Sequence, residues 1–188
     1  MTQRVVAAGN IAEFLSAVAA GNATKAREQL RSQPGIPKAS LAAAAVLGQF
    51  ATVERFLTAD PKLARLKTGT PPREPLHWLC YSPFCARRGP QILRCAKALL
   101  DAGADPDAHT VEREGTHTYP LGALYAAACH AKFPKLARLL LDAGADPDDG
   151  ETIFHAAEAN DRVILKMMVE YKADLDFNKT WGNTAIYF

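Results

Sequence analysis

The nine residues Leu99-Leu100-Asp101-Ala102-Gly103-Ala104-Asp105-Pro106-Asp107 recur letter for letter at residues 140–148. The two leucines end an amphipathic helical pattern, and the glycine suits the left-handed backbone found just past a helix C-terminus. The proline cannot continue a helix and favours extended backbone in the residue before it. The phrase therefore predicts a helix that ends in a sharp corner, formed twice in this chain.

Weaker copies of the phrase lie at residues 59–61 and 172–176. The corresponding alanines, Ala59, Ala104, Ala145 and Ala173, are separated by 45, 41 and 28 residues. These steps scatter about a unit of roughly 33 residues and indicate insertions in the middle of the chain. Because one short helical unit buries too little apolar surface to fold alone, we expect the units to stack on one another.

Each corner follows a long helix with one apolar stripe, and before that comes a shorter segment rich in small residues, which permits close helix approach. A further helix pair is expected within residues 11–31, with Asn22 capping its second helix. The predicted short inner helices lie at residues 41–46, 121–128 and 154–157.

Pro75-Leu76-His77, the stretches 150–157 and 182–187, and the two Gly-Ala-Asp phrases resemble the ankyrin repeat, whose unit opens on Gly-x-Thr-Pro-Leu-His-x-Ala. The resemblance is specific over about residues 70–188 and rests on helical pattern alone before that. It departs from the family at Gly122, which stands where the motif has histidine, in a fourth inner helix about four residues too long, and in an insertion at residues 81–90. It implies an all-α, ankyrin-repeat-like solenoid forming one domain over residues 1–188, with helix-turn-helix units at 8–36, 37–69, 70–108, 109–149 and 150–180 and a partial sixth at 181–188.

The resemblance also implies a non-catalytic scaffold that binds a partner protein in a groove formed by the inter-repeat loops and inner helices. In the family the motif histidine holds the start of the inner helix, so His77 and His155 are expected to be structural. The segment 109–119 is expected to be a long finger-like loop, either contacting the partner or simply mobile at the surface. Trp78 is expected in the core. The candidate partner contacts are Tyr81, Arg113, Glu114, His117, Tyr119, His130 and Asn160.

The composition and charge of the chain further narrow the classes of partner that we expect. The chain has 188 residues, is 48% hydrophobic and carries a formal net charge of +2. Residues 60–97 are mainly basic, and residues 101–151 are mainly acidic, which argues against a nucleic-acid partner. The sequence contains no run of about 20 apolar residues. We therefore expect a cytoplasmic protein that binds neither membrane nor nucleic acid, and no small-molecule substrate.

The sequence offers few candidate catalytic or metal-binding residues. His77, Cys80, Cys85 and Cys95 lack the Cys-x-x-Cys spacing typical of zinc sites, so reduced thiols, no metal and no cofactor are expected. Asp148 and Asp149 are expected to be exposed in a loop, without tuning of their pKa. Two other functions stay open: a targeting or regulatory ankyrin region of a larger, secreted bacterial effector, and an enzyme that uses the cysteines and histidines.

Overall fold

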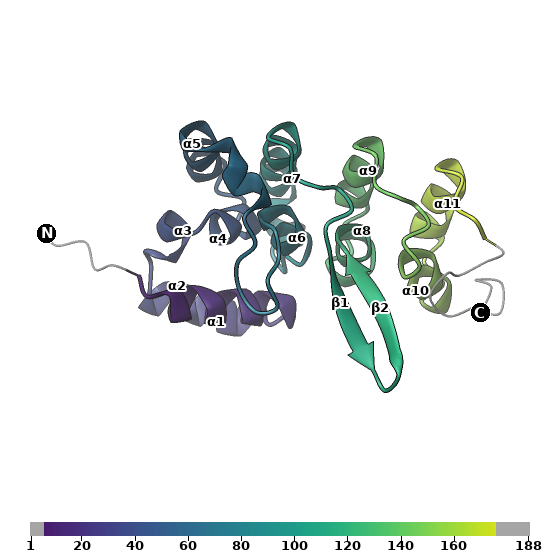
Figure 1. Ribbon diagram of the computed structural model, residues 1–188, viewed down its shortest axis with the longest axis horizontal. Helices are drawn as coiled ribbons and strands as arrows, with labels where there is room; N and C mark the ends of the chain where they lie inside the picture. Colours follow the sequence, from purple (N-terminus) through teal and green to yellow (C-terminus); the bar gives the residue numbers. More distant parts are fainter. Residues whose placement is uncertain (1–5, 176–188) are drawn as a thin grey trace, which may run out of the picture. The chain divides into compact units, whose positions relative to one another are not determined.

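The computed structural model describes residues 6–175, which form mainly helices and one two-stranded antiparallel sheet (Figure 1). The mainly helical class agrees with the sequence prediction, whereas the sheet was not expected. The chain divides into an N-terminal unit, residues 1–105, and a C-terminal unit, residues 106–188. The predicted partial repeat at 181–188 lies outside the described residues. Among the described helices, none is long and apolar enough to cross a membrane.

The N-terminal unit consists of paired helices. Its elements are α1 (Ala8–Ala19), α2 (Ala23–Ser32), α3 (Ile36–Ala39), α4 (Leu41–Val46), α5 (Phe50–Ala59), the 3-10 helix η1 (Pro61–Arg65), α6 (Pro75–Cys80) and α7 (Cys85–Asp101).

The C-terminal unit begins with a hairpin and continues with two helix pairs. Its elements are β1 (His109–Glu114), β2 (His117–Gly122), α8 (Ala123–Tyr125), the π-helical turn η2 (Ala126–His130), α9 (Pro134–Asp142), α10 (Thr152–Glu158) and α11 (Arg162–Glu170).

Within each unit, short helices pack on short helices and long helices on long ones. In the N-terminal unit α4 packs against α6, and α5 packs against α7. In the C-terminal unit η2 packs against α10, and α9 packs against α11. Each helix also contacts its own partner, as α4 does α5 and α10 does α11 (Figure 1). Successive pairs in a unit thus share one interior.

The short helices are thin, as the sequence predicts. Every residue of α4 is buried, and Ala43, Ala44 and Ala45 have no exposed surface. Alanine side chains allow neighbouring helices to approach closely, so α4 can contact α3, α5 and α6 at once. The predicted cap of α2 is also confirmed, because the Asn22 side chain accepts a hydrogen bond from the Lys25 amide at 2.9 Å.

The corners after α7 and α9 have the predicted left-handed glycines, with φ of 91° at Gly103 and 96° at Gly144. At the first corner the Ala104 amide donates to the Leu99 carbonyl at 2.9 Å. The weaker copy after α11 repeats this geometry without glycine, because Lys172 takes φ of 61°. The copy at residues 59–61 differs from the prediction: the chain enters η1 there, and Asp60 caps that helix by accepting from the Lys62 amide.

The structure corrects the prediction for residues 109–119, which form a β-hairpin with residues 120–122 and not a loop. β1 pairs with β2 in the register His109 opposite Gly122 through Glu114 opposite His117. The alternation of buried and exposed side chains explains why this segment forms strands, since Thr110 is buried and its neighbour Val111 is 65% exposed. Such a two-residue period is typical of a half-buried strand.

The two other irregularities of the repeat are the long fourth inner helix and the insertion at residues 81–90, and each is accommodated by a local change of structure. The turn η2 accommodates extra length in the fourth inner helix through the wider π-helical geometry. The insertion at 81–90 packs down: α7 already begins at Cys85 and bends at Arg88. The Ser82 hydroxyl donates to the Val46 carbonyl at 2.7 Å, and the Arg88 guanidinium donates to the Leu47 carbonyl at 2.8 Å. Both bonds hold the insertion against the end of α4.

We expect the corner glycines to be required for their conformation alone, since a Cβ at Gly103 or Gly144 would meet no atom within 4 Å. Gly103→Ala and Gly144→Ala should each lower the free energy of unfolding by about 1 kcal/mol, because an L-residue is strained in this region. Lys172→Gly should raise it by a similar amount. Urea denaturation measures the free energy of unfolding of all three variants. A change of the same sign in the alanine variants and in Lys172→Gly would contradict this account.

Candidate partner-binding surface

The N-terminal unit buries the aromatic residues that precede its insertion. Trp78 has no exposed surface, as predicted, and its indole Nε1 donates to the Thr68 carbonyl at 2.8 Å. Tyr81 was expected to line a groove, but it is only 4% exposed. The Arg73 guanidinium lies over both rings, 4.8 Å from the Trp78 centroid and 4.7 Å from that of Tyr81. The packed-down insertion thus leaves Tyr81 in the core.

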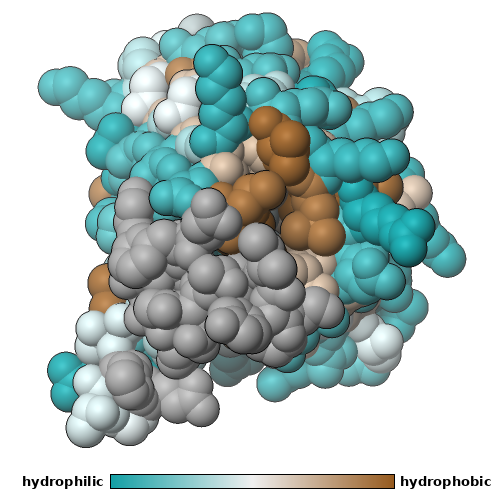
Figure 2. Space-filling view, turned by 90° about the vertical axis from the view of Figure 1, so that its right-hand side faces the viewer, coloured by the Kyte–Doolittle hydropathy of each residue, from teal (hydrophilic) through white to brown (hydrophobic). Residues whose placement is uncertain are grey.

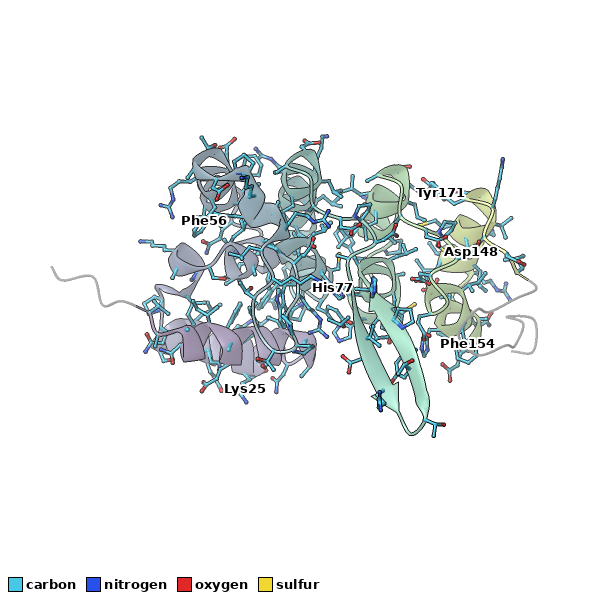
Figure 3. The ribbon with its side chains drawn as sticks, viewed as in Figure 1. Lys25, Phe56, His77, Asp148, Phe154 and Tyr171 are labelled. Carbon is cyan, nitrogen blue, oxygen red and sulfur yellow. The ribbon has the colours of Figure 1, made fainter. Side chains whose placement is uncertain are left out.

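The two motif histidines have different surroundings. His77 is 1% exposed and lies 5.5 Å from the Tyr81 ring, consistent with a structural role (Figure 3). The His155 side chain is 34% exposed and lies between two carboxylates, with Nε2 3.4 Å from Glu151 and Nδ1 3.1 Å from Glu158. The bond to Glu151, followed by that to Glu158, raises the pKa of His155 above its ordinary value of 6.5 against the opposing effect of burial.

The hairpin carries four of the candidate contacts. Arg113 is exposed and lies opposite Thr118, while Tyr119 is half-buried opposite Glu112. Glu114 and His117 face each other across the turn; their side chains lie outside the described part of the structure.

The remaining two candidates lie at the C-terminal ends of the inner helices of the C-terminal unit. His130 ends η2 and is half-buried, whereas Asn160 follows α10 and is exposed. Asn160 adopts φ of 51°, which places it in a tight turn. His130 is thus less exposed than the predicted exposed end of an inner helix, and the role of both residues in partner binding stays a prediction.

Sequence reasoning missed Tyr125, Phe154 and the two glutamates beside His155. The His155 ring centroid lies 5.1 Å from that of Tyr125 on α8 and 5.4 Å from that of Phe154 on α10. Phe154 is labelled in Figure 3. Burial raises the pKa of Tyr125, and nearby Cys129, Glu151, Tyr119 and Glu158 raise it further. Together these residues form what we call the aromatic–acidic surface: Tyr119, Tyr125, Glu151, Phe154, His155 and Glu158.

A hollow of about 580 Å³ lies beside the hairpin and is lined in part by Asp107, Asp146, Asp148 and Asp149. The Asp107 carboxylate accepts a hydrogen bond from the Asp146 amide at 2.7 Å, and Asp148 accepts from the Asp174 amide at 2.6 Å. Asp107 and Asp148 are the final residues of the two identical phrases. Each phrase is therefore bonded to the backbone of the next copy.

Asp149 corrects the expectation of an exposed, untuned carboxylate. It accepts hydrogen bonds from the Thr152 hydroxyl at 2.6 Å and from the amides of Thr152 and Glu151 at 2.7 and 3.0 Å, so it caps the start of α10. Burial raises the pKa of Asp149 to about 6, although these hydrogen bonds favour the ionised form.

The cysteines lack the features of reactive or metal-binding thiols. Burial raises the pKa of Cys85 and Cys95 to about 11 and that of Cys129 to about 12, and it raises the pKa of Cys80 as well. Since the thiolate is the nucleophile and the metal ligand, these thiols are poorly suited to either role at neutral pH. Among the side chains that the structure describes, which exclude those of Glu114 and His117, no group of three His, Cys, Asp or Glu residues is placed to hold a metal ion.

Apolar side chains gather on the face of the C-terminal unit seen in Figure 2, among hydrophilic ones. The large apolar residues exposed on α11 are Val163, at 59%, and Val169, at 56%. The opposite face of α11 is buried through Ile164, Met167 and Met168, and the Arg138 guanidinium on α9 donates to Glu170 at 2.7 Å.

No protein-family model matches this sequence, and no curated protein is significantly similar to it. The repeated phrases and the packing of the helices are therefore what a functional assignment rests on.

We expect the bonds between successive phrases to contribute to stability. Asp107→Ala and Asp148→Ala should each lower the free energy of unfolding by about 1 kcal/mol. Asp107→Ala should also speed hydrogen exchange at the Asp146 amide, and Asp148→Ala at the Asp174 amide, each without affecting the other. The matched Asn substitutions retain an acceptor oxygen and should largely preserve protection. Unchanged exchange in both alanine variants would refute the role of these bonds.

The titration of His155 provides a further test. Its raised pKa means that protonated His155 stabilises the fold at low pH and that this contribution is lost as the pH rises through the folded pKa. Glu158→Gln should lower the pKa of His155 and weaken the fall in unfolding free energy above pH 6.5. An NMR titration of the imidazole measures the shift, with Glu170→Gln on α11 as the control. A wild-type pKa below 6.5 would contradict the assigned pairing.

Proposed function

We propose that this chain is an ankyrin-type repeat protein that acts as a non-catalytic scaffold for a partner protein. The observation that carries the proposal is the pair of bonds from Asp107 to the Asp146 amide and from Asp148 to the Asp174 amide. These bonds, together with the packing of short helix on short helix and long on long, support a stack in which each helix pair of a unit covers the next.

A stack of this kind supports binding because it presents a continuous row of loops and inner helices. In the C-terminal unit that row includes Arg113 and Tyr119 on the hairpin, His130 at the end of η2, and Asn160 after α10. The hairpin is tied at its base, where the Ala123 amide donates to the Ala108 carbonyl at 2.9 Å. A preformed surface needs little ordering when a partner binds, which favours affinity.

The thiol chemistry also supports a scaffold over cysteine-based catalysis. Nucleophilic catalysis by cysteine depends on a lowered thiol pKa, usually beside a histidine or another cation. Here the pKa of all four cysteines is raised.

The proposal is tested by affinity capture with the full chain from its native cell, followed by quantitative mass spectrometry. The double variant Arg113→Glu, Tyr119→Ala should recover at least tenfold less of the specific partner than the wild type. Lys135→Glu makes the same charge change at an exposed position of α9 and serves as the control. Circular dichroism establishes that each variant is folded.

A partner recovered equally by the wild type and the double variant would remove the hairpin from the binding surface. Failure of the wild type to retain any protein above the level of an unrelated helical control would overturn the scaffold proposal itself.

A further inference from the structure

We propose that the aromatic–acidic surface of the C-terminal unit takes a lysine or arginine side chain from a basic segment of the partner protein. The inference rests on the proposed scaffold function and specifies the chemistry of what it binds.

The first support is the grouping of rings. Tyr125, Phe154 and His155 come from two neighbouring elements, and their centroids are 5.1 and 5.4 Å apart in successive pairs. All three side chains are partly exposed. The faces of Tyr125 and Phe154 attract lysine ammonium and arginine guanidinium groups through the ring quadrupole, so they favour a cationic ligand. The His155 ring adds to this attraction only when it is neutral.

The second support is the charge beside the rings. The Glu158 carboxylate contacts His155 Nδ1 at 3.1 Å, but its side chain is 58% exposed and so keeps room to accept from an incoming cation. Glu151 is 1% exposed and adds negative potential beside the rings. Burial is the main cause of the raised pKa of Tyr125, and Glu151 and Glu158 are among the groups that raise it further.

The third support is the charge of the whole unit. Residues 106–188 contain 8 lysines and arginines against 13 aspartates and glutamates, a formal net charge of −5. Residues 1–105 contain 14 against 7, a formal net charge of +7. The long-range field of the C-terminal unit therefore attracts a basic segment and repels an acidic one or a nucleic acid.

The aromatic rings distinguish the aromatic–acidic surface chemically from the aspartate-lined hollow beside the hairpin. In that hollow the carboxylates of Asp107, Asp146 and Asp148 each accept a backbone amide. Their hydrogen bonds already account for their position in the loops. The hollow is therefore a competing site to be distinguished by experiment.

The experiment uses the full chain and three nine-residue probe peptides, acetylated and amidated, in which glycine alternates with lysine, arginine or glutamate. Fluorescence anisotropy measures affinity, and NMR amide shifts locate the binding site. The lysine and arginine peptides should bind and shift the amides of Tyr125, Phe154 and His155. The glutamate peptide should not bind.

Two substitutions test the chemistry. Glu158→Gln removes the exposed charge, and Phe154→Leu removes a ring while keeping an apolar side chain. Each should weaken binding of the lysine peptide about two- to fivefold. Glu170→Gln removes the same charge from α11 and should leave the affinity within about 1.5-fold of the wild type. Thermal melts monitored by circular dichroism check the fold of each variant.

Shifts confined to the amides of residues 146–149 would place the cation in the aspartate-lined hollow and overturn the inference. Equal losses in Glu158→Gln and Glu170→Gln would also overturn it, because they indicate attraction without a site. If a natural partner is lost on Arg113→Glu, Tyr119→Ala but retained by Glu158→Gln and Phe154→Leu, the scaffold function stands and this inference fails.

Discussion

The packing of the C-terminal unit depends on hydrogen bonds that join each loop to the next. A carboxylate at the end of each repeated phrase accepts the amide of the following copy, and these are the short bonds of Asp107 and Asp148. A charged acceptor strengthens such a bond relative to a neutral one. In the N-terminal unit the buried Glu74 lies 3.2 Å from the Arg65 guanidinium, which also reaches Asp105 at 3.4 Å, so an ion-pair cluster joins the same kind of loops there.

Local rules in the sequence were sufficient for the features that depend on one or two residues. The glycines at 103 and 144 act through backbone conformation alone, and Asn22 caps α2 through its own side chain, so both could be predicted. The hairpin could not be predicted with the same ease, because its strands are short and Thr110 alone is buried among the described side chains of β1. Lys172 was also missed, since its left-handed conformation follows from the corner and not from the residue type.

The candidate surface was only partly visible for a related reason. A repeat pattern identifies positions beside the inner helices, and the structure places His130 and Asn160 there. It does not reveal where an insertion folds, and Tyr81 is buried because residues 82–88 are bonded back onto the end of α4. The grouping of Tyr125 with His155 joins residues 30 positions apart, and it depends on η2 packing against α10. No single stretch of sequence carries that information.

The hairpin leaves and re-enters the helical framework at almost the same point, through the bond between the Ala123 amide and the Ala108 carbonyl. Its length is thereby uncoupled from the spacing of the helices on either side. Two residues can be added to or removed from the arm symmetrically without altering the register of the remaining pairs. The reach of this arm is thus free to evolve while the helical framework that supports it stays the same.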